Sequence, residues 1–316
     1  MEPSPLEPPA AAGTSEPAGF VVVAASGDRI HFLDWSGAAE FPEPPGAPGV
    51  LAIHGLSQTG WIWAPIARRL RAIAGTPRLV TMDLRGHGLS DAPTEDGAYD
   101  LAVQATDAVA VAEGSGVLGE GDGIVLAGHG FGAIVAARTA LELRDRCAGL
   151  VLVDGGWEAL EATTGMDADE FLRGLDEPPE VMRSMTAFLA DRKGFDPGTW
   201  DADQERAALA TVVETHAGRV VPATRPHALE ACVRSMFTYD PMATLPAVPA
   251  PIIALAAADD EAGTRTRALA DVSAARVAAG RGAIESVPFH HDGHNLMRYR
   301  PREVAAAIAS IGSARR

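Results

Sequence analysis

The chain has 316 residues, of which 47% are hydrophobic and 22% charged, values typical of a soluble globular protein rather than a disordered one. Its net charge of −16 would repel nucleic acid and anionic membranes, so neither is expected as a partner. Cys147 and Cys232 lie far apart without a C-x-x-C pair, which argues against a disulfide framework or a zinc site and favours a reducing compartment. No apolar run approaches the roughly 20 residues of a membrane span, and the N-terminus lacks signal-peptide features. These features predict a cytoplasmic protein without a membrane anchor.

The N-terminal half alternates strands and helices. Residues 1–18 are rich in Pro, Ala, Glu and Ser and are expected to form a disordered tail. From Phe20, the runs FVVVAA and RIHFLDW predict an antiparallel pair of strands. Four further strands are expected within 49–55, 78–88, 123–132 and 149–156, with helices in 61–74, 99–114 and after 132. Continuously apolar strands that alternate with helices indicate an α/β protein whose mostly parallel sheet is covered by helices on both faces.

The alternation stops at Trp157 and resumes at about residue 250 with a strand, a helix, a strand and a final helix. The intervening segment has helical spacing in four stretches and no strand-like run. We therefore expect a core formed by 19–156 and 246–316, with residues 157–245 inserted as a helical cap.

Glycine- and histidine-containing motifs follow several of the predicted strands, at the carboxyl edge where open α/β sheets bind ligands. They are His54-Gly55-Leu56, Asp83-Leu84-Arg85-Gly86-His87-Gly88, Gly128-His129-Gly130-Phe131-Gly132, Asp259-Asp260 and His291-Asp292-Gly293-His294-Asn295. In this order and context they resemble the α/β-hydrolase superfamily, specifically its capped serine hydrolases, over about residues 20–312. The resemblance implies an α/β-hydrolase fold, a small-molecule substrate and no cofactor. It leaves the substrate's identity and the oligomeric state open.

The family's nucleophile elbow has the pattern G-x-S-x-G, whereas this sequence has G-H-G-F-G. Gly130 occupies the nucleophile position and has no side chain that could attack a carbonyl, so the acyl-enzyme route is closed. Glycine would also relieve the backbone strain of the elbow. A deliberate Ser→Gly inactivation and a natural homologue that needs no covalent nucleophile both fit this pattern. We favour a serine hydrolase whose serine has been replaced.

His294 is the expected general base, because it comes last in the family's chain order of nucleophile, acid and base. The resemblance places the acid at Asp260, at the end of a predicted strand, where its carboxylate would orient the histidine. Asp259, one residue away, is the main alternative. Asp154 is a third possibility, since some family members carry the acid after that earlier strand.

The resemblance assigns the oxyanion hole to the backbone N–H groups of Leu56 and Phe131. His54 is expected to fix the loop structurally, and Ser57 is not expected to act as a replacement nucleophile. No metal site is expected, because the histidine spacing matches no metal-ligand signature. Substrate-pocket residues are predicted on the loops and in the cap, with core packing as the alternative role, and the candidates are Trp61, Trp157, His129 and Met236.

The favoured function is hydrolysis of a carboxylic ester, a lactone or a related acyl compound, in which an active form would carry serine at position 130. One alternative is a nucleophile-independent lyase, isomerase or cofactor-free oxidative enzyme that uses His294 as its base. Another is a non-catalytic ligand-binding homologue that keeps the pocket.

Overall fold

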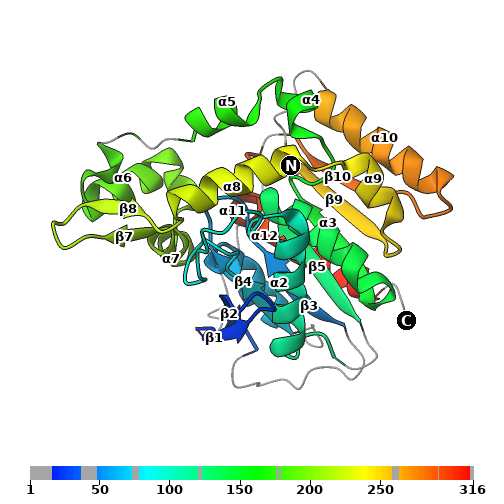
Figure 1. The fold of residues 1–316 in the computed structure, drawn as a ribbon, viewed down its shortest axis with the longest axis horizontal. Coiled ribbons are helices and arrows are strands. Elements are labelled where there is room, and N and C mark those ends of the chain that lie inside the picture. Colours follow the sequence, from blue (N-terminus) through cyan, green and yellow to red (C-terminus); the bar gives the residue numbers. More distant parts are fainter. Residues whose placement is uncertain are drawn as a thin grey trace, which may run out of the picture.

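A computed structural model describes residues 16–36, 48–72, 78–119, 123–175, 178, 180–257, 263–290 and 292–313. These residues form a sheet with the strand order β1-β2-β4-β3-β5-β6-β9-β10 (Figure 1). Its strands are β1 (Ala18–Val23), β2 (Arg29–Asp34), β3 (Gly49–Ile53), β4 (Leu79–Met82), β5 (Ile124–His129), β6 (Cys147–Val153), β9 (Ile252–Ala257) and β10 (Glu285–Phe289). Strand β2 runs antiparallel to β1 and β4, and the pairs from β4 to β10 are parallel. The predicted α/β architecture with an opening antiparallel pair is confirmed.

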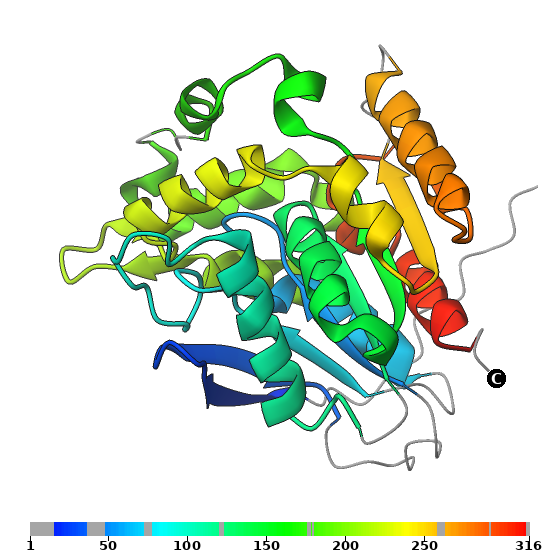
Figure 2. The same ribbon diagram turned by 45° about the vertical axis from the view of Figure 1, so that its right-hand side comes forward.

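Helices cover both faces of the sheet because its central strands are apolar on both sides. In β3, Val50 packs in the core with α1 (Ala64–Arg71) and α12 (Pro301–Ser313). The next residue, Leu51, packs in the opposite core with α2 (Leu101–Gly114), α3 (Phe131–Leu143) and α10 (Thr264–Ala278). Figures 1 and 2 show α2 and α3 side by side on one face of the sheet. The alternating side chains of one strand thus build two separate cores.

Most of the elements outside the sheet and its covering helices belong to the segment between β6 and β9. Most of them lie toward one end of the sheet (Figure 1). Its helices are α4 (Leu160–Thr164), α5 (Ala168–Arg173), α6 (Met185–Phe195), α7 (Ala202–Ala210), α8 (Pro226–Phe237) and α9 (Pro241–Thr244). It also contains the antiparallel strands β7 (Val212–Glu214) and β8 (Val220–Pro222), so the expectation of a segment without strands is wrong. Three-residue strands are too short to show a period-two pattern.

Short helical turns complete the described chain. The element before α12 is α11 (Leu296–Tyr299), and the 3₁₀ turns are η1 (Gly60–Trp63), η2 (Arg144–Arg146), η3 (Val181–Arg183), η4 (Pro197–Thr199) and η5 (Leu245–Ala247). The Pro-rich run from residue 245 forms η5 and the turn into β9.

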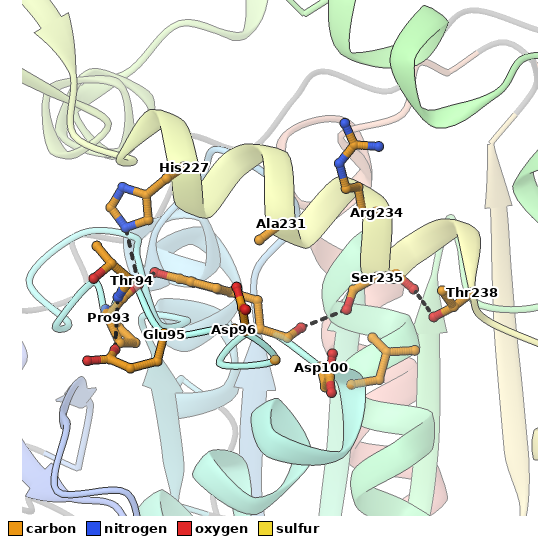
Figure 3. Close-up of a pocket in the computed structure, with 13 residues that line it drawn as sticks. Pro93, Thr94, Glu95, Asp96, Asp100, His227, Ala231, Arg234, Ser235 and Thr238 are labelled. Atoms are coloured by element: carbon orange, nitrogen blue, oxygen red, sulfur yellow. Dashed lines mark hydrogen bonds between the residues drawn. The ribbon is translucent and has the colours of Figure 1, made fainter.

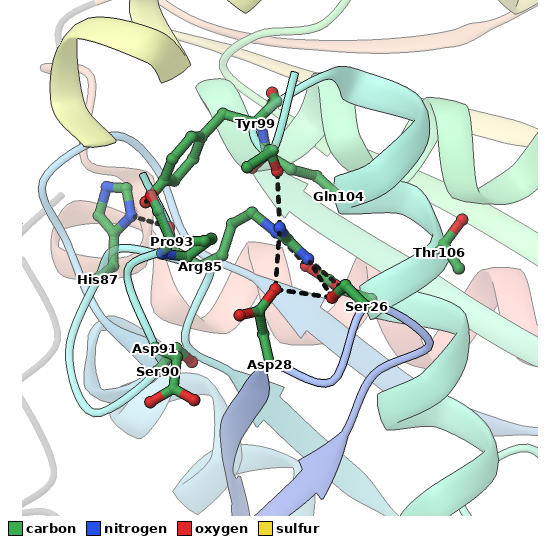
Figure 4. Close-up of polar contacts among 12 residues, drawn as sticks. Ser26, Asp28, Arg85, His87, Ser90, Asp91, Pro93, Tyr99, Gln104 and Thr106 are labelled. Carbon is green, nitrogen blue, oxygen red and sulfur yellow. Dashed lines mark hydrogen bonds and ion pairs between the residues drawn. The ribbon is translucent and has the colours of Figure 1, made fainter. Parts of the chain in front are cut away.

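A buried arginine anchors the loop that contains the Asp-Leu-Arg-Gly-His-Gly motif (Figure 4). The Arg85 guanidinium, 1% exposed, makes two hydrogen bonds to the Asp107 carboxylate, at 2.6 and 2.7 Å. It also donates to the carbonyl oxygen of Ala98 at 2.7 Å and lies 3.5 Å from Asp28. Such planar, bidentate pairing fixes both position and orientation. The loop that follows β4 is therefore held rigidly against α2.

Strand β1 begins at Ala18, the last residue of the predicted tail, and residues 1–15 of that tail lie outside the described part. The Glu16 carboxylate lies 3.3 Å from the Arg68 guanidinium of α1. Across the described ranges, no helix is long and apolar enough to span a membrane.

Candidate active site

The turn between β5 and α3 has the geometry of a nucleophile elbow. Gly130 has φ +52° and ψ −116°, a backbone conformation that side-chain-bearing residues rarely adopt. The flanking glycines are required by close packing, since a Cβ on Gly128 would lie 2.2 Å from the Gly132 oxygen. A Cβ on Gly132 would lie 2.3 Å from the backbone oxygen of His54. The expected small residues on both sides of residue 130 are thus what allow this turn to form.

His294 approaches the elbow from the loop between β10 and α11. An ideal Cβ on Gly130 would lie 3.1 Å from Nε2 of His294, closer than to any other atom outside the adjacent residues. A side chain at position 130 would therefore meet His294 before any other group. The other ring nitrogen, Nδ1, lies 2.5 Å from Oδ2 of Asp154.

Asp154, directly after β6, is a buried and strongly hydrogen-bonded carboxylate. Its side chain is 2% exposed, and its Oδ1 accepts from the Ala257 N–H and lies 2.9 Å from the Arg265 guanidinium. Burial alone would raise the pKa of Asp154, but the hydrogen bond to His294, the charge of Arg265 and the Ala257 N–H together lower it to about 2. Asp154 is therefore ionised at neutral pH and can orient and stabilise the His294 imidazole.

Among the three aspartates considered from the sequence, the described contact with His294 belongs to Asp154. Asp259 and Asp260 lie outside the described residues. The preference for Asp260 stays a prediction, while the geometry favours the third alternative, Asp154.

The loop after β3 lies across from the elbow and is fixed by a buried histidine. His54 Nδ1 donates to the Gly55 oxygen at 2.7 Å, and its Nε2 accepts from the Leu84 N–H at 3.0 Å. Burial lowers the pKa of His54, which is consistent with this neutral, structural role. The ring of His87 packs on it with centroids 5.2 Å apart, so the Arg85-anchored loop supports the Gly55–Leu56 segment.

Leu56 lines the cavity described below, as does Phe131. Phe131 is the first residue of α3, so its N–H is one of those without an intrahelical acceptor. Both residues therefore line the cavity, and their role as oxyanion donors stays a prediction.

His129 packs directly under the His294 ring, with centroids 4.4 Å apart. Its Nε2 lies 3.0 Å from the backbone oxygen of His294, and its Nδ1 lies 3.0 Å from Oε1 of Gln58, so a neutral ring donates its one N–H to one of these two oxygens. Burial and the neighbouring His294 lower the pKa of His129 to about 3, so the ring is neutral. His129 therefore connects the oxyanion loop to the His294 loop and holds the latter in place.

A cavity of about 690 Å³ opens over Gly130 and His294 and includes residues of the segment between β6 and β9. Its apolar wall is formed by Leu56, Phe131, Ile134, Leu160, Phe171, Leu175 and Met236. Its polar lining comprises Ser57, Gln58, His129, Asp154, Glu158, Thr163, Thr164, Thr264, Arg265 and His294. A cavity that combines an apolar wall with convergent polar groups is typical of a small-molecule site.

Two of the four predicted pocket residues, His129 and Met236, line this cavity. Contrary to expectation, Trp61 and Trp157 are not part of its lining as described. Trp61 packs edge-on against Trp35, with ring centroids 5.6 Å apart. Trp157 is 1% exposed, and the Arg265 guanidinium lies over its indole ring, 5.2 Å from the centroid of that ring. Both tryptophans take the packing role that was the alternative reading.

Ser57 lines the cavity and has φ +59°, but no hydrogen bond joins it to His294 within the described residues. This placement agrees with the expectation that Ser57 is not a substitute nucleophile.

Glu158 and Arg265 are site residues that sequence reasoning did not find. The Arg265 guanidinium lies between the carboxylates of Asp154 and Glu158, 2.9 Å from an oxygen of each. Glu158 follows Asp154 by four positions and Arg265 is the second residue of α10, and neither belongs to a recognisable motif. Only the folded arrangement of β6 and α10 brings them together.

A second pocket lies apart from this site, between the loop before α2 and helix α8 (Figure 3). Its wall includes the acidic side chains of Glu95, Asp96 and Asp100, and across from them His227 and Arg234. His227 lies 3.2 Å from the Pro93 oxygen, and the Ser235 hydroxyl donates to the Tyr99 oxygen at 2.7 Å (Figure 3). These bonds join the loop to α8.

Solved structures with the same fold cover almost the whole chain. The structure titled E-2-(acetamidomethylene)succinate hydrolase superposes with a TM-score of 0.70 and 20% identity, covering 93% of this chain and 98% of that one. A putative aryl esterase from Burkholderia cenocepacia gives a TM-score of 0.63 and 23% identity, covering 94% and 98% of the two chains. At these identities the likeness establishes the fold alone.

Curated relatives are similar over parts of the chain. Lipase LipV of Mycobacterium tuberculosis is 36% identical over 113 residues, which span 35% of this chain and 38% of the lipase. The putative carbamate hydrolase RutD of Variovorax paradoxus is 28% identical over 219 residues, 69% of this chain and 76% of that protein. The family model described as the alpha/beta hydrolase family matches residues 50–307. The chain belongs to the alpha/beta hydrolase family.

Proposed function

We propose that the cavity binds a carboxylic ester, a lactone or a related acyl compound, and that the chain is the scaffold of a serine hydrolase whose nucleophile is replaced by Gly130. One observation carries this proposal: Nε2 of His294 faces the position of a residue-130 side chain, while Nδ1 is held by Asp154. This arrangement is the base and acid of a hydrolytic triad directed at the place of its nucleophile.

With serine at position 130, the hydroxyl would attack the acyl carbonyl while His294 Nε2 accepts its proton. Asp154 would stabilise the imidazolium, and the N–H groups of Leu56 and Phe131 would stabilise the oxyanion. His294 would then return the proton to the leaving alcohol. Water would hydrolyse the acyl-enzyme by the same steps in reverse order.

With glycine at position 130, no acyl-enzyme can form. His294 can still accept a proton from a water molecule that attacks the bound acyl group directly. Serine hydrolases without their nucleophile retain roughly 10³–10⁴-fold catalysis over the uncatalysed reaction. We therefore expect weak, burst-free hydrolysis from the chain as it stands.

The same geometry favours a second candidate, in which His294 removes a proton from an acidic C–H group and no nucleophile is needed. The supporting observation is that the His294–Asp154 pair is complete without a residue-130 side chain. This candidate predicts that serine at position 130 does not improve the native reaction. A ligand-binding protein without turnover predicts, in addition, that His294→Ala changes no rate.

The test is hydrolysis of a panel of p-nitrophenyl esters and lactones by the native chain and by Gly130→Ser, each with and without His294→Ala. The proposal predicts a burst of p-nitrophenolate with Gly130→Ser that His294→Ala abolishes. No gain from serine across the panel would contradict it and favour the second candidate or the binding protein.

A further inference from the structure

Three helices of the segment between β6 and β9 contribute apolar side chains to one side of the active-site cavity. Leu160 begins α4, Phe171 lies in α5 and Met236 lies in α8, and all three line the cavity. Helix α8 contacts both α4 and α5, and the Phe171 ring meets that of Phe237 edge-on, with centroids 5.7 Å apart. These three side chains therefore belong to one surface, which we call the helical wall.

The helical wall keeps apolar surface that the protein itself does not cover. The structure describes every residue of α4 and α5, and none of them is buried. Leu160 and Phe171 are thus covered by protein atoms only in part. A ligand that covers such surface gains about fourfold in affinity for each CH₂ group that it buries.

The hydroxyl groups beside the helical wall are engaged in backbone hydrogen bonds. The Thr163 hydroxyl donates to the Ala159 oxygen at 3.2 Å, and the Thr164 hydroxyl donates to the Leu160 oxygen at 2.7 Å. A carboxylate accepts hydrogen bonds and needs donors. Both threonines use their one donor within the turn that starts α4, so neither offers it to an anionic ligand.

Arg265 is the one Lys or Arg side chain among the described residues that line the cavity. Its guanidinium lies 2.9 Å from a carboxylate oxygen of Asp154 and 2.9 Å from one of Glu158. The Asp154 carboxylate alone balances its positive charge, and the whole chain has a net charge of −16. A ligand carboxylate that left water for this cavity would pay a large desolvation cost without an uncompensated cation in return.

We propose that the cavity selects acyl compounds whose acyl group is an uncharged hydrocarbon chain or ring, and that it rejects those that carry a second, ionised carboxylate. The hydrocarbon preference follows from the helical wall. The rejection of carboxylates follows from the charge balance around Arg265. That the ligand is an acyl compound rests on the proposed function.

The first test is equilibrium binding to the native chain, which needs no turnover. Methyl butanoate, methyl hexanoate and methyl octanoate are titrated by ligand-observed NMR at mildly alkaline pH. Monomethyl adipate, in which a carboxylate replaces the terminal methyl group of methyl hexanoate, is titrated beside them. We expect affinity to rise about fourfold per CH₂ group, and monomethyl adipate to bind about a hundredfold more weakly than methyl hexanoate. Equal binding of these two esters, or no binding of methyl octanoate, would overturn the proposal.

Dimethyl adipate separates charge from size, because it has the skeleton of monomethyl adipate without the negative charge. We expect it to bind within about tenfold of methyl hexanoate, since a neutral ester group costs far less to desolvate than a carboxylate. Binding as weak as that of monomethyl adipate would mean that size excludes both compounds, and would contradict the charge argument.

Phe171→Ala locates the acyl group at the helical wall. Loss of this ring should weaken methyl octanoate about tenfold and methyl butanoate much less. Phe195→Ala is the matched control, because Phe195 lies in the same segment but is 81% exposed and does not line the cavity. Equal losses in the two variants, or none in Phe171→Ala, would overturn the assignment of the wall.

Thr164→Lys should relax the rejection of carboxylates. Thr164 lines the cavity and is also exposed to solvent, so a lysine there adds a cation without burying it. We expect monomethyl adipate to gain about fivefold in affinity. Ala162→Lys, on the same helix but outside the lining, is the control and should leave the affinity unchanged. A gain of the same size in both variants, or in neither, would contradict the proposal.

The outcomes also separate this inference from the proposed function. If the binding preferences hold but Gly130→Ser hydrolyses no ester, only the proposed function fails. If Gly130→Ser hydrolyses esters but monomethyl adipate binds as tightly as methyl hexanoate, only the present inference fails.

Discussion

Nδ1 of His294 lies 2.5 Å from Oδ2 of Asp154, although the two residues are 140 positions apart in the chain. The aspartate follows β6 and the histidine follows β10, and β9 separates these two strands in the sheet. The contact fixes which ring nitrogen faces the cavity. The opposite nitrogen, Nε2, is left pointing at Gly130.

Replacing Gly130 by serine should lower stability while it adds the missing nucleophile. A side chain at φ +52° costs about 1–3 kcal/mol, and its Cβ would press on His294, whose exposed ring can shift slightly. Urea unfolding of native protein, Gly130→Ser and Gly130→Ala measures this cost. Gly282→Ala is the matched control, since Gly282 lacks a positive φ and its Cβ would meet open space. A loss in the control as large as in the two variants would mean that strain at the elbow is not the cause.

Asp154→Asn should abolish most of the hydrolysis that serine at position 130 restores, without weakening substrate binding. In the Gly130→Ser background, an amide at position 154 no longer stabilises the His294 imidazolium, and kcat should fall by about 10⁴-fold, as in other hydrolytic triads. KM should change little, because Asp154 reaches the substrate only through His294. Steady-state kinetics on the best ester of the panel provides both constants. An unchanged kcat would move the acid role to another residue, with Asp259 and Asp260 next in order.

Stability should depend on pH through Asp154. The pKa of Asp154 is about 2 in the folded protein, below the ordinary aspartate value of 3.8 that applies to the unfolded chain. Folding therefore favours the ionised form. This contribution, roughly 2 kcal/mol, is fully present above the unfolded pKa and is lost as the pH falls toward the folded pKa. The difference in unfolding free energy between native protein and Asp154→Asn should therefore shrink between about pH 5 and pH 3. A difference that stays constant over this window would exclude the linkage.

Arg85→Met should destabilise the protein by about 3–5 kcal/mol, because it leaves the Asp107 carboxylate buried without its partner. The double variant Arg85→Met/Asp107→Leu should recover much of that loss, since both charges are then gone. The exposed pair of Arg146 and Glu113 offers a control, and Arg146→Ala should cost less than about 1 kcal/mol. Thermal and urea unfolding compare these three variants with the native protein. Equal losses for the buried and exposed pairs would contradict the anchoring role of Arg85.

The sequence predicts the elbow and the place of His294 well because both depend on short local motifs. The glycines around residue 130 and the apolar strands before each loop carry their structural meaning within a few residues. The acid could not be chosen in this way. Its identity depends on which strand end lies beside the His294 loop, and that is set by contacts across β6, β9 and β10 rather than by local pattern.

Glu158 and Arg265 escaped prediction for the same reason. An isolated glutamate before one helix and an arginine at the start of another are ordinary surface features in a sequence. Their pairing becomes visible only when β6 and α10 bring them to one cavity. Trp61 shows the converse case, because its position near a site-forming loop predicted a pocket residue, whereas its ring packs against Trp35.

The most direct test of the central claim, that His294 and Asp154 are aimed at an absent nucleophile, is covalent labelling followed by intact-mass measurement. Native protein, Gly130→Ser and Gly130→Ser/His294→Ala are incubated with a fluorophosphonate, which reports an activated serine regardless of substrate preference. We expect one adduct on Gly130→Ser, located by peptide mapping to the introduced serine, none on the native chain, and labelling slowed by orders of magnitude without His294. An unlabelled Gly130→Ser that is folded, or labelling that does not depend on His294, would contradict the account.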